Sequence, residues 1–135
     1  MTAEIPDLDE ALALYDAVGW TAYTRDPGTL ARGLDGSAHV VAARDADGHL
    51  VGLARVVGDG ATIAYLQDVL VDPSVQRSGI GRALVTSAFA PFAGVRQHVL
   101  LTDAEAGQRG FYEALGFTEV HDHEPGLRAF VRTGG

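Results

Sequence analysis

Cysteine and lysine are both missing from this chain of 135 residues, and each absence removes a class of chemistry. Without cysteine there is no disulfide, no thiolate nucleophile and no cysteine-ligated metal. Because all ten basic residues are arginine, mechanisms that use a lysine Schiff base or a lysine general base are excluded. A Walker-type phosphate loop is excluded as well, since that motif requires its lysine.

Long apolar runs and an excess of basic charge are missing too. No run approaches the ~20 residues of a membrane-spanning helix, and residues 1–6 lack the basic and apolar segments of a signal peptide. We therefore expect no membrane partner and a cytoplasmic location. The net charge of −8 argues against a nucleic-acid partner, which needs basic groups facing its phosphates, and is compatible with a cationic substrate.

The patterns that are present predict one domain, residues 1–135, of the mixed α/β class. Two helices precede a three-stranded antiparallel meander, which leads into a helix, a strand, a helix and a final hairpin. The expected ranges are 8–18, 27–34, 38–44, 49–57, 61–71, 80–89, 95–102, 108–115, 117–121 and 127–131. A capping box of Asp7 and Glu10 starts the first helix. The strands at 61–71 and 95–102 should be parallel, because a helix crosses between them.

The segment Gln76–Arg82, between a strand and a helix start, has the composition of an anion site. Unpaired N–H groups at a helix N-terminus point outward, and the helix dipole favours negative charge there. Gly79 and Gly81 let the backbone approach a phosphate closely. Arg77 and Arg82 flank the loop with guanidinium groups suited to phosphate oxygens. The segment therefore predicts a ligand that carries phosphate.

A dinucleotide is one alternative for that ligand. Gly79 and Gly81 supply two glycines of a G-x-G-x-x-G motif, and Asp103 falls about 20 residues on, where a ribose-binding acid is expected. The third glycine position is Leu84, however. The antiparallel lead-in also argues against a doubly wound sheet.

Two segments resemble the GNAT superfamily of N-acetyltransferases. Residues 69–84, VLVDPSVQRSGIGRAL, are similar to its acyl-CoA loop, and residues 110–117, GFYEALGF, to its second signature. The resemblance covers about residues 50–117. It implies a three-layer α-β-α fold whose mostly antiparallel sheet has a central, splayed pair of parallel strands. It also implies transfer of an acetyl group from acetyl-CoA to a primary amine of a small molecule or peptide, and a possible homodimer.

The resemblance also implies the site residues. The CoA pyrophosphate would bind the loop, and the pantetheine arm would bind the open edge of the preceding strand, where a backbone N–H near Leu70 would stabilise the developing oxyanion. The cofactor-binding residues so expected are Val69, Leu70, Val71, Gln76, Arg77, Ser78, Gly79, Ile80, Gly81, Arg82 and Ala83. Tyr112 would be the general acid that protonates the leaving thiolate. The alternative for Tyr112 is a buried aromatic in a packed cluster.

The general base is predicted to be Asp68. Side chains alternate along a strand, so Tyr65, Gln67 and Val69 share one face and Asp68 takes the other, unless a bulge turns Asp68 inward. The alternative is a structural carboxylate that bonds to nearby backbone or arginine groups. One departure from the family is Glu105, because many members have asparagine seven residues before the tyrosine.

Other side chains have two interpretations each. Tyr15, Trp20 and Tyr23 either line an amine pocket through cation–π contacts or pack locally. His121 and His123 share a face of an expected strand with no third ligand nearby, so we expect no metal. A non-catalytic module that binds or senses acyl-CoA is the alternative to an enzyme.

Overall fold

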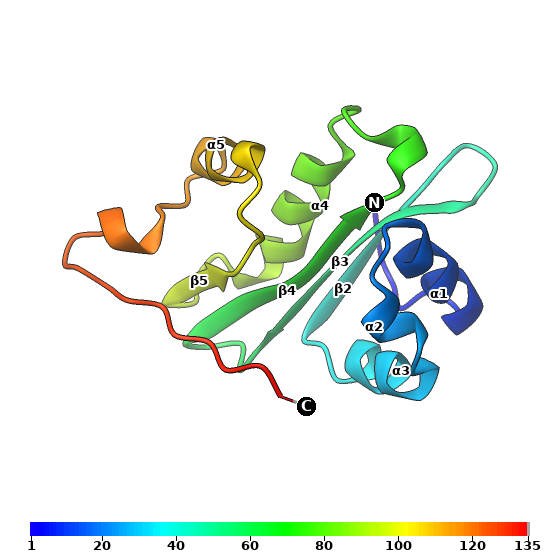
Figure 1. Cartoon of the computed structure of the whole chain (residues 1–135), viewed down its shortest axis with the longest axis horizontal. Coiled ribbons are helices and arrows are strands. Elements are labelled where there is room, and N and C mark those ends of the chain that lie inside the picture. The colour runs from blue at the N-terminus through cyan, green and yellow to red at the C-terminus, as the bar shows by residue number, and fades with distance from the viewer. Residues whose placement is uncertain (135) are drawn as a thin grey trace. The chain divides into compact units, whose positions relative to one another are not determined.

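The computed structural model describes residues 1–134 and divides into two compact units, the first spanning Met1–Leu101 and the second beginning at Thr102. Within these residues five strands form one sheet in the order β1-β2-β3-β4-β5, all in the first unit (Figure 1). Their bounds are β1 Thr2–Ala3, β2 His39–Arg44, β3 Leu50–Gly58, β4 Ile63–Val71 and β5 Gln97–Leu100. Neighbouring strands are antiparallel except β4 and β5, which are parallel as predicted.

Helices lie on both faces of this sheet. In the first unit they are α1 Leu8–Ala17, α2 Thr21–Thr24, α3 Pro27–Asp35 and α4 Ile80–Phe89, with 3₁₀ turns η1 Pro73–Val75 and η2 Ala90–Phe92. Figure 1 shows α1, α2 and α3 on one side of β2–β4 and α4 on the other, so the predicted three-layer arrangement is confirmed. The second unit contains α5 Ala106–Ala114 and η3 Val120–Asp122. No helix within residues 1–134 has both the length and the apolar character to cross a membrane.

Local signals explain the helix ends. Gly19 has a φ of 80°, the left-handed conformation that follows many helix C-termini, and it comes directly after Val18, the C-cap of α1. Asp26 caps α3 by accepting a hydrogen bond from the backbone N–H of Thr29 at 3.2 Å. The Asp7 side chain makes no cap hydrogen bond, so that half of the predicted capping box does not form.

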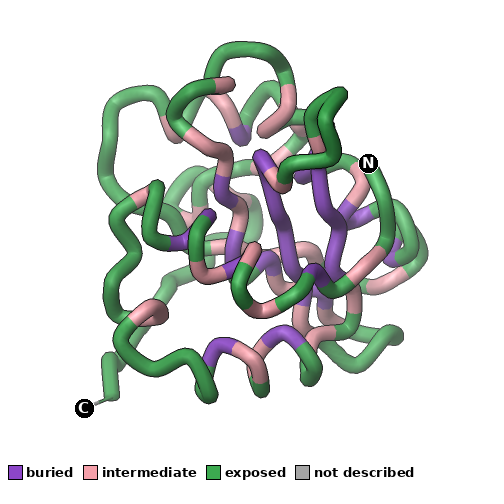
Figure 2. Tube along the Cα trace, turned by 90° about the vertical axis from the view of Figure 1, so that its right-hand side faces the viewer, coloured by how far each residue is buried: buried purple, intermediate pink, exposed green. Residues whose placement is uncertain are grey.

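The core lies between the sheet and the helices on either side. Strands β2 and β3 are buried along nearly their whole length, as expected of strands covered on both faces (Figure 2). On the face of α1 and α3 one buried cluster consists of Ala11, Leu14, Tyr15, Leu30, Leu34, Val40, Leu53 and Leu70.

The prediction of a final hairpin is wrong. Within the described residues the segments 117–121 and 127–131 hold no strand, and part of the first belongs to η3. Arg109 of α5 instead forms ion pairs with Glu119 at 3.1 Å and with Asp122 at 2.6 Å, at either end of η3. Strand β5 is therefore an edge strand, and the parallel pair lies at the edge of the sheet instead of its centre.

Gly52 of β3 lets α4 pack closely on the sheet. A Cβ at this position would lie 2.8 Å from Cδ1 of Leu84 and 3.2 Å from Cγ2 of Ile80, both on α4. Because Leu84 is fully buried, the added carbon requires a shift of its side chain or of the helix.

We expect Gly52→Ala to lower the free energy of unfolding by about 1–3 kcal/mol, the cost of overpacking a core. Urea unfolding measures this loss. Gly94→Ala is the matched control, since a Cβ there meets nothing within 4 Å, and its effect should stay within about 0.5 kcal/mol. Equal losses in the two variants would contradict the role given to Gly52.

Candidate active site

Strand β4 contains a bulge at the point where it leaves β5. Arg55 of β3 pairs with Asp68, and the next residue of β3 pairs with Leu66, so Gln67 is an extra residue without a partner in β3. The parallel ladder to β5 ends at the pair Leu66–Leu100. Beyond this point, among the described residues, β4 is paired on one side only.

The unpaired side of β4 exposes backbone groups of alternate residues. The N–H of Asp72 donates to the carbonyl of Val51 in β3 at 2.8 Å. In an antiparallel ladder every second residue bonds to the same neighbour, so Leu70 also faces β3. The N–H and C=O groups of Val69 and Val71 therefore point to the open side.

The bulge turns Asp68 toward α1 and α2, which replaces the simple alternation expected from the sequence. Its carboxylate is 3% exposed. Oδ2 accepts hydrogen bonds from Nε of Arg55 at 2.6 Å and from the hydroxyl of Tyr15 at 2.8 Å. Oδ1 accepts from the hydroxyl of Tyr23 at 3.1 Å. Three donors from three elements thus occupy both oxygens.

This buried network shifts the pKa of its members. Burial raises the pKa of the Tyr15 phenol, and the negative charge of Asp68 raises it further. For Arg55, burial is the largest single effect and lowers the pKa. The charge and hydrogen bond of Asp68, together with Tyr23 and Tyr15, outweigh burial, so the net shift of the pKa is upward. Both shifts favour a neutral tyrosine and a charged arginine at neutral pH.

Aromatic rings surround the network. The ring of Tyr15 lies 4.9 Å from that of Tyr23 and 5.8 Å from that of Trp20. Trp20 is 36% exposed and Tyr23 is partly buried. The mutual contacts show local packing, and the expected amine pocket stays a prediction.

The loop between β4 and α4 holds itself in shape through its own side chains. Asp72 accepts a hydrogen bond from the N–H of Ser74 at 2.9 Å, and the hydroxyl of Ser78 donates to the carbonyl of Val75 at 2.5 Å. Arg77 has a φ of 69° and Gly79 a φ of 83°. Arginine rarely adopts this left-handed conformation, which costs about 1–2 kcal/mol, so the surrounding loop must enforce it.

The loop leads into the N-terminus of α4, which has no side-chain cap and is exposed to solvent. Gly79 is the N-cap of α4 and has no side chain to satisfy the first N–H groups of the helix. Residues 76–79 are exposed, as is Arg82 in the first turn. Within residues 1–134 neither Arg77 nor Arg82 forms an ion pair with a carboxylate. Free N–H donors and two available cations are the groups that bind anions at helix N-termini, and the binding of phosphate at this loop stays a prediction.

Tyr112 belongs to the second unit. It lies on α5, is 9% exposed, and its ring contacts those of Phe111 and Phe117 edge-on at 4.9 and 5.9 Å. Burial raises the pKa of its phenol, and the charge of Asp103 adds to the shift. The aromatic cluster predicted around this residue is present, and its role as a general acid stays a prediction.

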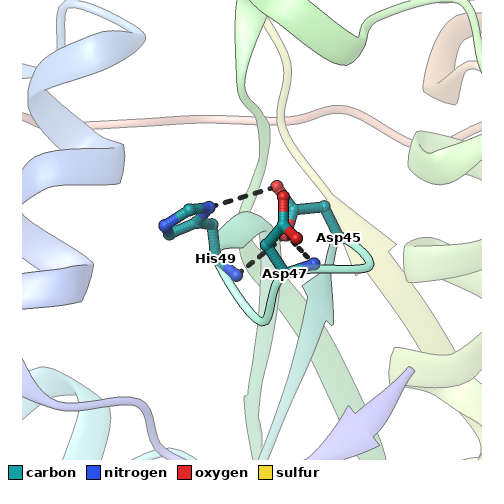
Figure 3. A group of neighbouring side chains, drawn as sticks. All are labelled: Asp45, Asp47 and His49. Atoms are coloured by element: carbon teal, nitrogen blue, oxygen red, sulfur yellow. Dashed lines mark hydrogen bonds and ion pairs between the residues drawn. The ribbon is translucent and has the colours of Figure 1, made fainter.

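One group of possible metal ligands was not predicted from the sequence. Asp45, Asp47 and His49 lie in the turn between β2 and β3, with ligand atoms within 4.8 Å of one another (Figure 3). Asp45 Oδ1 accepts hydrogen bonds from the N–H groups of Asp47 and His49, both at 2.9 Å. The signal available in the sequence was the spacing of these three residues, each two residues from the next, at a predicted turn. These bonds are those of an Asp-stabilised hairpin turn, which accounts for the arrangement.

Comparison with known proteins gives a consistent result. A family model described as an acetyltransferase (GNAT) domain matches residues 35–119. The chain is similar to the solved GNAT-family acetyltransferase SP0256 of Streptococcus pneumoniae, with 34% identity, a TM-score of 0.83, and coverage of 98% of this chain and 97% of that one. The structure of SA2161 of Staphylococcus aureus, at 22% identity and a TM-score of 0.75, shares the fold, with coverage of 98% and 97%.

Curated plant and algal proteins are also similar. Serotonin N-acetyltransferase 2, chloroplastic, of Oryza sativa is 37% identical over 91 residues, which are 67% of this chain and 45% of the rice protein. The uncharacterized N-acetyltransferase ycf52 of Pyropia yezoensis is 27% identical over 93% of this chain and 73% of its own length. The chain thus spans less than half of the rice relative's length.

We expect Arg55→Met to lower the free energy of unfolding by about 3–5 kcal/mol, because it leaves the Asp68 carboxylate buried without its cation. Urea unfolding measures the loss. Arg44→Met is the matched control, since Arg44 pairs with Glu4 and Glu10 where all three side chains are about a third exposed. That variant should lose about 1 kcal/mol or less. A similar loss in both would contradict the importance of the buried pair.

Proposed function

The chain belongs to the GNAT family of acetyltransferases, and we propose that it transfers an acetyl group from acetyl-CoA directly to an amine. The observation that carries the proposal is one continuous surface feature of the first unit. The open edge of β4 leads through the loop at 72–79 to the uncapped N-terminus of α4. One side of this feature suits an extended amide chain, and its end suits phosphate.

The residues present fit CoA in two separate ways. The first-turn N–H groups of α4, with Arg77 and Arg82, would hold the pyrophosphate. The outward-facing N–H and C=O groups of Val69 and Val71 would pair with the amides of the pantetheine arm, as an added strand pairs with a sheet edge. This second contact is available because β4 has left β5 at Gln67.

Acetyl-CoA supplies an activated acyl group, and the protein would supply a donor and a proton. A backbone N–H on the open side of β4, from Val69 or Val71, would stabilise negative charge that develops on the thioester oxygen. As the C–S bond breaks and the new C–N bond forms, Tyr112 would give its proton to the departing sulfur. The proton that the amine nitrogen loses would pass to solvent, from which the phenol regains one. A phenol is protonated at neutral pH, and burial raises the pKa of Tyr112 further, so the donor form is the one present.

The acceptor we propose is a primary amine of a small molecule or peptide. The net charge of −8 favours a cationic acceptor over an anionic one. Trp20, partly exposed beside Tyr23, offers an aromatic face for an ammonium or an aryl group. The name of the rice relative, a serotonin N-acetyltransferase, is consistent with an arylalkylamine among the candidates.

Release of free thiol from acetyl-CoA in the presence of a panel of amines tests the function. We expect release that depends on an acceptor, and we expect Tyr112→Phe to lower kcat about tenfold or more, since a positioned proton donor contributes at least that factor. CoA binding should be unchanged in this variant. Tight binding of CoA with no acceptor turned over would instead support a non-catalytic acyl-CoA module.

A charge at the N-cap of α4 tests the phosphate site. Asparagine and aspartate both tolerate the left-handed conformation of Gly79, and a Cβ there meets nothing within 4 Å. We expect Gly79→Asp to weaken CoA binding about tenfold or more through repulsion of the pyrophosphate, and Gly79→Asn to stay within about threefold of the wild type. Isothermal calorimetry measures both. Equal affinities would mean that the phosphates bind elsewhere.

A further inference from the structure

We infer that Asp68 is a positioning residue whose buried bonds hold the bulge of β4 and so set the open edge on which the thioester is aligned. This inference rests on the proposed function, because it assigns a task to that site. It also gives Asp68 a role different from the general base expected from the sequence.

The bulge and the end of the parallel ladder coincide at one residue. Gln67 has no partner in β3, and the ladder to β5 stops immediately before it, at Leu66. Without the extra residue, the backbone groups of β4 would continue to alternate between the side of β3 and the opposite side. Val69 and Val71 would then turn their N–H and C=O groups toward β3, because a one-residue shift reverses the facing of every later residue. The bulge therefore decides which backbone groups reach the open side.

Asp68 is the first residue after the bulge, and its side chain is bonded to three other elements. Its oxygens accept bonds from Arg55 of β3, Tyr15 of α1 and Tyr23 of α2 at 2.6, 2.8 and 3.1 Å. In the unbulged register Asp68 would point to the opposite face of the sheet and lose all three donors. The carboxylate and Arg55 would then be buried apart, at a large cost.

The same bonds argue against Asp68 as the group that takes a proton from the acceptor. Both oxygens are occupied by donors, and the side chain is 3% exposed. Oδ1 accepts one of these bonds and could accept another, but a side chain this deeply buried leaves an acceptor amine little access to either oxygen. The geometry is that of an anchor.

The two roles differ in a binding measurement made without any acceptor. A base for the acceptor has no part in holding CoA, whereas an anchor of the β4 edge affects the contact with the pantetheine arm. Tyr15→Phe and Tyr23→Phe each remove one hydroxyl from Asp68 and leave its ion pair with Arg55 intact. Tyr65→Phe is the matched control, because Tyr65 lies in the part of β4 that is paired on both sides, to Val57 and Val99.

The experiment is isothermal calorimetry of CoA binding to the wild type, the three tyrosine variants and Asp68→Asn, with steady-state kinetics on the same samples. We expect the Kd for CoA to rise about threefold or more in Tyr15→Phe and Tyr23→Phe, and more again in Asp68→Asn. The KM for acetyl-CoA should rise in step. Tyr65→Phe should leave the Kd unchanged. Because calorimetry also reports the fraction of competent protein, partial unfolding lowers that fraction and not the affinity of the folded part.

The possible results separate cleanly. If Tyr15→Phe and Tyr23→Phe bind CoA with the same Kd as the wild type, the inference is wrong and the proposed function is unaffected. A wild type that binds no CoA would overturn the proposed function itself. If Asp68→Asn lowers kcat with an unchanged Kd for CoA, and the acidic limb of the pH–rate profile disappears, Asp68 is the base and the anchor role is wrong.

Discussion

The buried ion pair between Arg55 and Asp68 joins the sheet to the helices that cover one of its faces. Arg55 lies on β3, Asp68 on β4, and the hydroxyls of Tyr15 and Tyr23 extend the same network into α1 and α2. A charge this deeply buried is tolerated only when its partner and hydrogen bonds are all in place. The register of β3 with β4 and the seating of both helices are therefore set together.

On the opposite face of the sheet, helix α4 and the loop before it position the second part of the candidate site. Close packing of α4 at Gly52 fixes where that helix begins, and the loop before it arrives through left-handed residues at Arg77 and Gly79. Strain at Arg77 is held by neighbours whose side chains bond to the loop backbone. The open edge of β4 is thus followed in the chain by the uncapped N-terminus of α4, and a different layer of helices supports each.

The sequence predicted the elements whose signals are local and missed those that depend on contacts between distant residues. Alternation and turn residues placed β2, β3 and β4 within a residue or two, and glycine at 79 placed the start of α4. The final hairpin was predicted wrongly, because an alternating pattern contains no information on contacts such as those of Arg109 with Glu119 and Asp122. Likewise, the sequence allowed a bulge in β4 but did not predict it. Its position depends on the partners of Asp68 in β3 and on the helices, which are distant in the chain.

A buried ion pair gives a protein little net stability, because apolar residues of similar volume often stabilise the fold equally well. Its presence here is better explained by what apolar residues cannot do. A leucine at position 68 could face either side of the sheet with little penalty, so the register would be weakly specified. A carboxylate with three donors on one side has only one acceptable orientation. The pair therefore selects the bulged register over the regular one, and with it the backbone groups that β4 presents at its open edge.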